Sequence, residues 1–394
     1  MPSVVVMGGS LGGLTAALFL RDAGCRVKVF ERSRTPLAGR GAGIVLNPAT
    51  VRYFTSRKTR DVRSMSVATQ WLRYLGADGR IAAGQQVSYR FSSYNAIYHA
   101  LLTDFGPDDY YLARTVTGFE QDARGVTVHM EGASSERCEL LVCADGVRSS
   151  ARNWLVGESC LEYAGYVAWR GMLSQDQVAP ETFAFLRESI VYHILPAGHV
   201  LVYPIPVIEE GMSEPERYIN WLWYRNVPAG HAFAALMTDE DGNMRDVSLG
   251  PGEVREENLA ALRRDAADTL PPAIAELIHG TEQPFIQAMI DCEVPHMAFG
   301  RVALMGDGAF VARPHAAAGT AKAAEDGWQL SLALEAAGGD VLAALKRWEA
   351  GQLRLGRSLV ERNRQAGERL QNGTWPVGAP LAFGLYETGD SVMP

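Results

Sequence analysis

The chain has 394 residues, a length that fits two interlocked domains and favours an enzyme over a small binding module. Hydrophobic residues make up 47% and charged residues 21%, which excludes a disordered or low-complexity protein. There are 37 basic and 45 acidic residues, a net charge of −8, without long runs of one sign. We therefore expect small-molecule partners, with no nucleic acid and no membrane. The 40 glycines are an excess that needs a structural reason.

The cysteines and the apolar N-terminal run indicate in which cellular compartment the protein is expected. The five cysteines are odd in number and form no Cys-x-x-Cys pair, which argues against a disulfide framework and against a zinc site. The uncharged run over residues 4–20 has no basic leader and is interrupted by glycines, so it predicts strand, turn and helix rather than a signal or anchor. We expect a cytoplasmic protein without a metal site.

The first thirty residues predict a βαβ unit. Residues 4–7 are a short β-branched run typical of a buried strand. The apolar positions that follow Leu11 predict a helix that stops at Gly24, and residues 26–30 predict a second strand. Such a unit is the building block of dinucleotide-binding domains.

The turn inside this unit carries a glycine pattern. In a Gly-x-Gly-x-x-Gly register the glycines fall at Gly8 and Gly13, while Ser10 takes the middle place. Helix N–H groups and the helix dipole at such a turn favour a pyrophosphate. Glu31 follows Gly8 by 23 residues, where a ribose-binding acid belongs, and favours NAD or FAD over NADP as the resident dinucleotide. The alternative is a glycine-rich turn that binds no ligand.

Two later segments repeat the pattern of a strand followed by glycine and aspartate. Residues 140–144 predict a strand that runs into Asp145 and Gly146, and residues 302–305 predict one that runs into Asp307 between two glycines. Ligands of open α/β sheets bind at the carboxyl ends of the strands. The three segments therefore predict one sheet assembled from distant parts of the chain.

In order and spacing, the three motifs resemble those of the single-component FAD-dependent aromatic hydroxylases, the para-hydroxybenzoate hydroxylase-like group. The resemblance spans nearly the whole chain, and residues 90–98, 163–171, 313–323 and 380–385 resemble a branch that acts on a dihydroxypyridine. It implies a monooxygenase that uses NAD(P)H and molecular oxygen to hydroxylate a small hydroxylated aromatic or N-heteroaromatic ring through a flavin hydroperoxide. NADH or NADPH would bind transiently, because no second glycine-rich βαβ unit is visible.

The same resemblance assigns roles around FAD. It implies that Asp307 accepts a hydrogen bond from the ribityl chain, and that Gly319 presents helix N–H groups to the flavin pyrimidine edge. Asp145 and Gly146, with Arg152 behind them, would support the pyrophosphate side and the nicotinamide.

The sequence also departs from the family pattern. Tyr94 stands where the family has an arginine that contacts FAD, so we expect Arg114, in the following strand, to supply the cation. Phe310 and residues 317–321 also differ from the usual motifs, which weakens the transfer of contacts around the flavin ring. The expected cofactor-binding residues are Gly8, Ser10, Leu11, Gly12, Gly13, Glu31, Arg32, Arg114, Asp145, Gly146, Asp307, Pro314, Gly319 and Thr320.

The candidates for acting on the substrate are His315, His193, Tyr203, Tyr166 and Arg170, of which His315, Tyr203 and Arg170 are preferred. His315 lies in the turn that the family places beside the flavin, and a histidine changes protonation near neutral pH. Tyr203 could orient a ring hydroxyl, and Arg170 could form a pocket wall. Each has a structural alternative: a turn histidine, a sheet-anchoring tyrosine and an arginine that reaches from a packed sheet to solvent.

The predicted fold is mixed α/β: a Rossmann-like FAD-binding domain, an inserted antiparallel-sheet substrate domain, and C-terminal helices. Alternating runs such as residues 200–205 predict the sheet, and residues 320–336 and 340–370 predict the helices, the second with Asp340 as N-cap and Gly373 close to its stop. The predicted domain ranges are 1–65, 100–160 and 296–340 for FAD, 66–99 and 161–295 for substrate, and 341–394 for the long helix and tail.

Other functions fit the same scaffold. An FAD-dependent oxidase or dehydrogenase is one alternative, and a dinucleotide-binding sensor without turnover is another. A halogenase is disfavoured because the Trp-x-Trp-x-Ile pattern of that group is absent. We also expect that the chain could form a homodimer.

Overall fold

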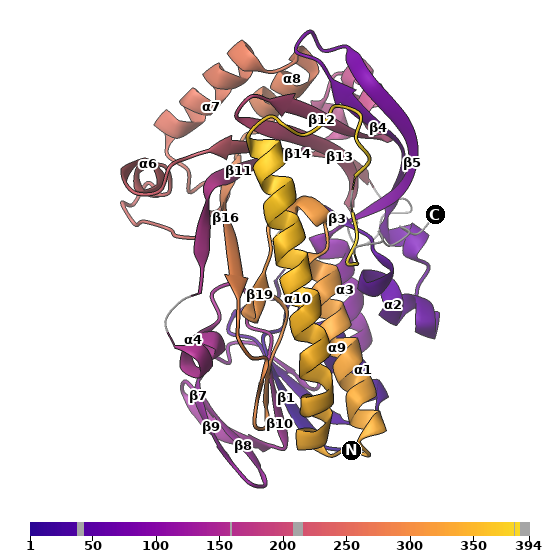
Figure 1. The fold of residues 1–394 in the computed structure, drawn as a ribbon, viewed down its shortest axis with the longest axis vertical. Coiled ribbons are helices and arrows are strands. Elements are labelled where there is room, and N and C mark those ends of the chain that lie inside the picture. Colours follow the sequence, from indigo (N-terminus) through magenta and orange to yellow (C-terminus); the bar gives the residue numbers. More distant parts are fainter. Residues whose placement is uncertain (38–42, 158–159, 208–215, 382, 387–394) are drawn as a thin grey trace.

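The computed structural model describes the chain except residues 38–42, 158–159, 208–215, 382 and 387–394. Figure 1 shows two halves stacked along the long axis. The lower half holds a mainly parallel sheet, and the upper half holds a larger, mainly antiparallel one. The long helix α10 (Val341–Gln371) runs along both halves.

The lower sheet unites distant parts of the chain. Its strand order is β17-β18-β10-β1-β2-β6, and Val4 of β1 lies opposite Leu140 of β10 in parallel register. Leu141 in turn lies opposite Val302. The bounds are β1 (Ser3–Met7), β2 (Arg26–Phe30), β6 (Tyr110–Tyr111), β10 (Leu140–Cys143), β17 (Ala298–Phe299) and β18 (Val302–Leu304). The three glycine turns therefore meet at one edge, as the sequence predicts.

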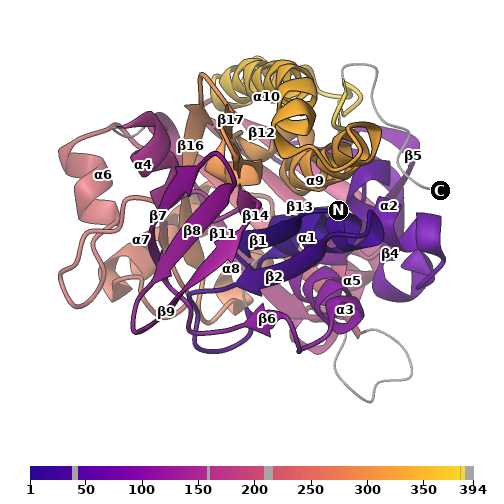
Figure 2. The ribbon, with the colours of Figure 1, turned by 90° about the horizontal axis from the view of Figure 1, so that it is seen from below.

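Helices cover one face of this sheet and a small sheet covers the other (Figure 2). Close packing of α1 against α9 depends on Gly327, where a Cβ atom would lie 2.7 Å from the Cα of Ala16. These helices are α1 (Leu11–Asp22), α2 (Pro48–Arg57), α3 (Tyr94–Phe105) and α9 (Gly319–Ala336), whereas α4 (Ser150–Val156) lies beside the small sheet, where Trp154 meets Phe119 edge-on. The small sheet consists of β7 (Val116–Asp122), β8 (Gly125–Met130) and β9 (Ala133–Cys138).

The upper sheet has two different faces. Its order is β15-β16-β11-β14-β13-β12-β4-β5-β3, with antiparallel pairs except for the parallel pair β4–β12. Along β14, Trp221 and Trp223 pack into the core under the helices, while Leu222 and Tyr224 face the lower half. The bounds are β3 (Gly43–Val45), β4 (Val67–Leu75), β5 (Ile81–Ser93), β11 (Glu162–Ser174), β12 (Ser189–Leu195), β13 (Gly198–Val207), β14 (Glu216–Asn226), β15 (Ser248–Leu249) and β16 (Phe285–Glu293).

The middle of the chain is less uniform than its alternating runs suggest. Helices follow the strands and pack on the tryptophan face of the sheet, where they bury Leu262 and Ile274. They are α5 (Pro180–Leu186), α6 (His231–Leu236), α7 (Glu256–Thr269) and α8 (Pro272–Gly280). Strand β3 joins the upper sheet from within residues 1–65, and α3 crosses the expected boundary at residues 99–100. Local patterns do not reveal which sheet a short strand will join.

The C-terminal helices follow the sequence closely. The Asp340 carboxylate accepts hydrogen bonds from the N–H groups of Leu342 and Ala343, so it caps α10 as expected. Gly373 has a φ of 65°, a left-handed conformation that suits glycine and turns the chain after the helix. Helix α10 packs on α9 below and reaches β13 and β14 above.

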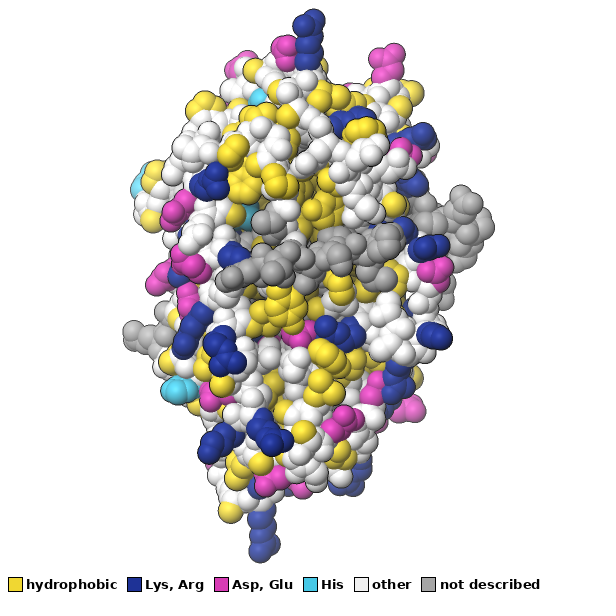
Figure 3. Space-filling model, turned by 45° about the vertical axis from the view of Figure 1, so that its right-hand side comes forward, with side chains coloured by type: hydrophobic (Ala, Val, Ile, Leu, Met, Phe, Trp, Pro, Cys, Tyr) yellow, Lys and Arg dark blue, Asp and Glu magenta, His cyan; other side chains and the backbone are white. Residues whose placement is uncertain are grey.

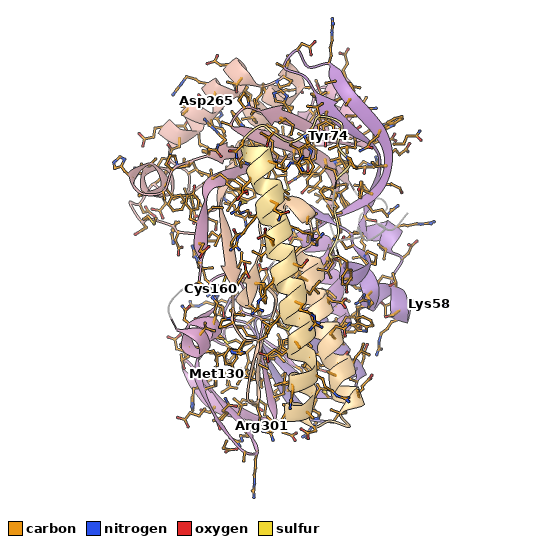
Figure 4. The ribbon with its side chains drawn as sticks, in the orientation of Figure 1. Lys58, Tyr74, Met130, Cys160, Asp265 and Arg301 are labelled. Carbon is orange, nitrogen blue, oxygen red and sulfur yellow. A yellow bond between two sulfur atoms is a disulfide. The ribbon has the colours of Figure 1, made fainter. Side chains whose placement is uncertain are left out.

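One prediction from the cysteines needs correction. Cys160 and Cys292 form a disulfide, 132 residues apart in sequence, which joins the segments where the chain enters and leaves the upper sheet. Cys160 is labelled at the waist of the molecule in Figure 4. The spacing of the cysteines could not reveal this pair, because tertiary structure alone brings β11 and β16 together. Cys25, Cys138 and Cys143 are free and buried.

The described residues show no group of three or more His, Cys, Asp or Glu side chains arranged for a metal. Among the same residues, we find no helix both long and apolar enough to cross a membrane. Figure 3 shows basic and acidic side chains interspersed over one face, without a patch of one sign.

Candidate active site

A cavity of about 440 Å³ lies between the two halves. Its floor is the carboxyl edge of the parallel sheet together with the first turns of α1 and α9, and its roof is the Tyr224 face of the upper sheet. Figure 3 shows hydrophobic side chains gathered in the upper middle of one face. The cavity therefore has two chemically different ends. One is rich in backbone N–H groups, and the other is lined by apolar and aromatic side chains.

The α1 end fits a pyrophosphate. Ser10 is the N-cap of α1 but its side chain makes no capping bond; it pairs instead with the Tyr94 hydroxyl at 2.8 Å. Leu11 and Gly12 line the cavity beside it. A Cβ on Gly13 would lie 1.9 Å from the carbonyl oxygen of Gly8, so the turn admits only glycine there. Uncapped helix N–H groups next to such a close turn are a suitable anion site.

Glu31 lies directly beneath this turn. One carboxylate oxygen accepts from the Gly9 N–H at 2.9 Å and the other from the Ser33 N–H at 2.8 Å. The side chain is buried, and each oxygen retains a second lone pair that could accept a ribose hydroxyl. Tyr110 donates to the Gly9 carbonyl at 3.0 Å and holds the opposite side of the turn.

In the Asp145 segment, the aspartate holds neighbouring parts of the chain and the glycine lines the cavity. The Asp145 carboxylate accepts from Ser149 Oγ at 2.6 Å and from the Ala151 N–H, so it holds the start of α4, while Gly146 lines the cavity. Arg152 is almost fully buried and donates to the carbonyl oxygens of Asp307 and Gly308, both at 3.2 Å. It therefore ties two of the glycine turns together rather than reaching the cavity.

Asp307 occupies the place expected of a flavin-contacting acid. Its side chain is open to the cavity but ringed by protein, and desolvation raises its pKa, an effect that nearby Lys322 and Arg152 oppose. Behind it, Lys322 donates to both oxygens of Asp326 at 2.6 and 2.7 Å, and Asp326 accepts from the Gly306 N–H at 2.9 Å. This buried pair fixes the turn that presents Asp307.

The first turn of α9 forms the other side of the site. Gly319 and Thr320 line the cavity, as does Pro314, and the N-cap Ala318 makes no side-chain capping bond. No atom lies within 4 Å of the place that a Cβ on Gly319 would take, so this helix end is open towards the cavity. Free N–H groups here could stabilise negative charge on a flavin pyrimidine edge.

The expected substitute cation is not in this site. Arg114 lies in the turn before β7, not in a strand, and donates to the adjacent carbonyl of Ala113 at 3.3 Å. Arg32, which follows Glu31 in the chain, is exposed. Neither is among the described residues that line the cavity, whereas Tyr94 is.

Arg170 and Tyr203 stand together in the apolar end. Arg170 donates to Gln287 Oε1 at 2.7 Å, and its buried Nε has no partner among the described residues. Tyr203 donates to the Gly43 carbonyl at 3.2 Å and stacks on Phe91 with a centroid separation of 4.4 Å. Burial raises the pKa of Tyr203, against the opposing effect of Arg170, so the phenol stays protonated near neutral pH.

His315 lies behind the cavity wall. Its Nε2 hydrogen-bonds the Tyr166 hydroxyl at 2.7 Å, and it is not among the described cavity-lining residues. Burial, with a contribution from Arg313, lowers its pKa to about 3. So low a pKa makes His315 a weak proton acceptor, and its hydrogen bond to Tyr166 is what the structural alternative describes.

Sequence reasoning missed several residues of the site. Lys322 and Asp326 are four residues apart on one helix face, a spacing that could have indicated an ion pair. Phe383 lines the cavity from the C-terminal tail, and nothing in the local sequence indicates this position.

Comparisons with known proteins agree with this geometry. Residues 3–56 match the family described as Pyridine nucleotide-disulphide oxidoreductase, and residues 163–291 match the family described as FAD binding domain-like. The chain is 35% identical to 2,6-dihydroxypyridine 3-monooxygenase of Paenarthrobacter nicotinovorans, over 97% of this chain and 95% of that protein. It is 25% identical to 6-hydroxynicotinate 3-monooxygenase of Pseudomonas fluorescens, over 86% and 83%.

Solved structures lead to the same group. The structure of 2,6-dihydroxypyridine-3-hydroxylase from Arthrobacter nicotinovorans superposes with a TM-score of 0.91 at 35% identity, covering 97% of this chain and 96% of that one. A salicylate hydroxylase substrate complex shares the fold, with a TM-score of 0.73 at 19% identity, over 94% and 89%. The glycine cradles, the two open helix ends and the acid at residue 307 fit FAD. The chain thus belongs to the FAD-dependent aromatic hydroxylases and is a flavin-dependent aromatic monooxygenase.

Proposed function

We propose that this enzyme hydroxylates a small hydroxypyridine, of which a dihydroxypyridine is the first choice, with NADH or NADPH as reductant. The observation that carries the substrate class is Arg170, whose partly exposed side chain lines the aromatic end of the cavity, whereas Arg313 in the same lining is paired with Asp291. The anion of a dihydroxypyridine, a small flat ring that carries negative charge on its oxygens, would suit a cation beside aromatic walls. The relatives named for 2,6-dihydroxypyridine and 6-hydroxynicotinate support this class.

Two residues would position and activate the ring. Arg170 would bind a ring oxygen and stabilise its anionic form, which makes the ring more electron-rich. Tyr203 already donates its proton to Gly43, so its oxygen can accept a hydrogen bond from a second ring hydroxyl. The stacked Phe91 and Tyr203 rings would hold the substrate plane and exclude water.

FAD, when bound, supplies the activation of oxygen, and the chain supplies its binding site. The first turn of α1 would hold the pyrophosphate, Glu31 the ribose and Asp307 the ribityl hydroxyls. The N–H groups at Gly319 and Thr320 would face the flavin pyrimidine edge. NAD(P)H would approach transiently at the Gly146 side of the cavity. A homodimer remains a prediction, as does a cytoplasmic location, which the Cys160–Cys292 disulfide does not favour.

The experiment measures reduced-nucleotide oxidation by purified, FAD-loaded enzyme with three ring compounds. These are 2,6-dihydroxypyridine, 6-hydroxynicotinate and 3-hydroxybenzoate, each tested with NADH and with NADPH. We expect 2,6-dihydroxypyridine to stimulate oxidation most strongly and to give a product heavier by one oxygen atom. Stoichiometric peroxide without a new product would favour the oxidase alternative, and preference for 3-hydroxybenzoate would refute the substrate class.

The variant Arg170→Met tests the residue that carries the proposal. We expect its KM for the hydroxypyridine to rise about tenfold to a hundredfold, because a charge-assisted hydrogen bond is lost, while FAD binding stays unchanged. Met172→Ala is a matched control, since Met172 lies on the same strand but outside the cavity. An unchanged KM in Arg170→Met would remove Arg170 from the site.

A further inference from the structure

The chain after α10 forms a tail that crosses the upper sheet. In Figure 1 the tail leaves the top of α10 and descends past β12 and β5 towards β3. Trp375 Nε1 donates to the Tyr74 hydroxyl at 3.1 Å, and that hydroxyl donates to the Ala379 carbonyl at 2.7 Å. Tyr74 is labelled in the upper half of Figure 4. This part of the tail is therefore anchored to β4.

A second anchor holds the far part of the tail. The Gly384 N–H donates to the Ala316 carbonyl at 2.9 Å, in the turn that precedes α9. Arg362 of α10 donates to the carbonyl oxygens of Gly384 and Leu385 at 3.2 and 2.7 Å. Leu385 is 1% exposed. Backbone contacts at Ala379 and at Gly384 thus hold the tail on both sides of Phe383.

Phe383 is the described tail residue that lines the cavity. It is 4% exposed, and its ring meets Tyr89 edge-on with a centroid separation of 5.3 Å. It belongs to the same buried cluster as Phe91, Tyr203 and Tyr224, which form the roof of the apolar end. A ring bound beside these residues would meet Phe383 at the edge of the chamber.

We propose that Phe383 closes the substrate chamber and limits it to a single ring, so that the C-terminal tail is a specificity-determining part of the enzyme. This inference rests on the proposed function, because it names the size of the substrate that the same site accepts. Phenylalanine is large and rigid, and both tail anchors hold its backbone, so a fused second ring could enter only by displacing it. Replacement by a smaller side chain should open that space.

The experiment compares FAD-loaded wild type, Phe383→Ala and Phe383→Leu with Leu381→Ala. Leu381 is a matched control, because it packs on the same cluster but is not among the described cavity-lining residues. The ligands are 2,6-dihydroxypyridine and the two-ring 2,4-dihydroxyquinoline. Their dissociation constants come from the change in flavin absorbance, and kcat/KM from stimulated NADH oxidation.

We expect Phe383→Ala to raise the preference for the two-ring compound over the one-ring compound at least tenfold. Phe383→Leu should give a smaller shift in the same direction, and Leu381→Ala should stay within twofold of wild type. Equal preferences in Phe383→Leu and wild type would overturn the proposal, even if Phe383→Ala fails to fold. Failure of the proposed function would appear differently, as a wild type that turns over no hydroxypyridine while the binding preferences still shift.

Discussion

Tyr166 and His315 are joined by a 2.7 Å hydrogen bond between the phenol oxygen and Nε2, with their rings inclined by 26°. Their positions are 149 residues apart in sequence. On the other side, a Cβ on Gly367 of α10 would lie 2.6 Å from the phenol oxygen, so the long helix encloses the pair. The pair therefore joins the upper sheet, the turn before α9 and the long helix.

Burial of His315 makes stability depend on pH. Its pKa is about 3 in the folded chain against about 6.5 when unfolded, so the unfolded state binds more protons between these values. Stability should fall as the pH drops from about 6.5 towards 3, by less than about 1.4 kcal/mol per pH unit from this group. We expect the free energy of unfolding, measured with urea, to fall less between pH 7.5 and pH 5 in His315→Gln than in wild type.

Tyr166→Phe is the control for this effect. It removes the hydrogen bond but leaves the histidine, so it should lower stability by about 1 kcal/mol at every pH while keeping the wild-type pH dependence. His199, whose pKa is lowered by burial and further by the neighbouring His315, is present in all three proteins, so its contribution cancels between wild type and Tyr166→Phe but changes slightly in His315→Gln. Parallel pH profiles for wild type and His315→Gln would contradict the prediction.

The buried pair Lys322–Asp326 should stabilise both the fold and the FAD site. Asp326→Asn keeps an acceptor for the Gly306 N–H but leaves the Lys322 charge unpaired in a buried place. We expect a loss of about 3–5 kcal/mol in the free energy of unfolding, together with weaker FAD binding. Arg137→Met is the control, because its pair with Asp122 is solvent-exposed and should contribute less than about 1 kcal/mol. Similar losses in both variants would show that burial of the pair is unimportant.

The turn before α1 should tolerate no side chain at Gly13. In Gly13→Ala the new Cβ would collide with the carbonyl oxygen of Gly8, so the turn must open. We expect FAD affinity, measured by absorbance titration, to fall at least tenfold. Gly118→Ala in β7 has no atom within 4 Å of the new Cβ and should bind FAD like wild type. Retention of FAD by Gly13→Ala would rule out this turn as the pyrophosphate site.

The disulfide between Cys160 and Cys292 should stabilise the junction of the two halves. It closes a long loop, so Cys160→Ser should lower the free energy of unfolding by about 2–4 kcal/mol, and a reductant should affect wild type but not the variant. Urea unfolding of both proteins, with and without dithiothreitol, measures these changes in the free energy of unfolding. Cys25→Ser, at a free buried cysteine, is the control that keeps the response to reductant. Equal stability with and without reductant in wild type would show that the bond is not formed in solution.

The sequence determined the parts of this protein that depend on neighbouring residues. The glycine turn between β1 and α1, the Asp340 cap and the stop at Gly373 lie within a few residues of the elements they set, so spacing and residue type identify them. The strand ends at Asp145 and Asp307 could also be predicted, because each motif directly follows its strand. Their order along the chain indicated the family.

Tertiary structure alone decided the rest. Arg152 contacts the Asp307 segment across 155 residues, and the disulfide spans 132, so no local pattern encodes either contact. The same holds for His315, whose turn is near the site although its ring points into the core beside Tyr166. Phe383 reaches the cavity only because the tail is anchored at Tyr74 and Ala316. Periodicity predicts which elements form, whereas burial and packing between distant segments decide which side chains face the substrate.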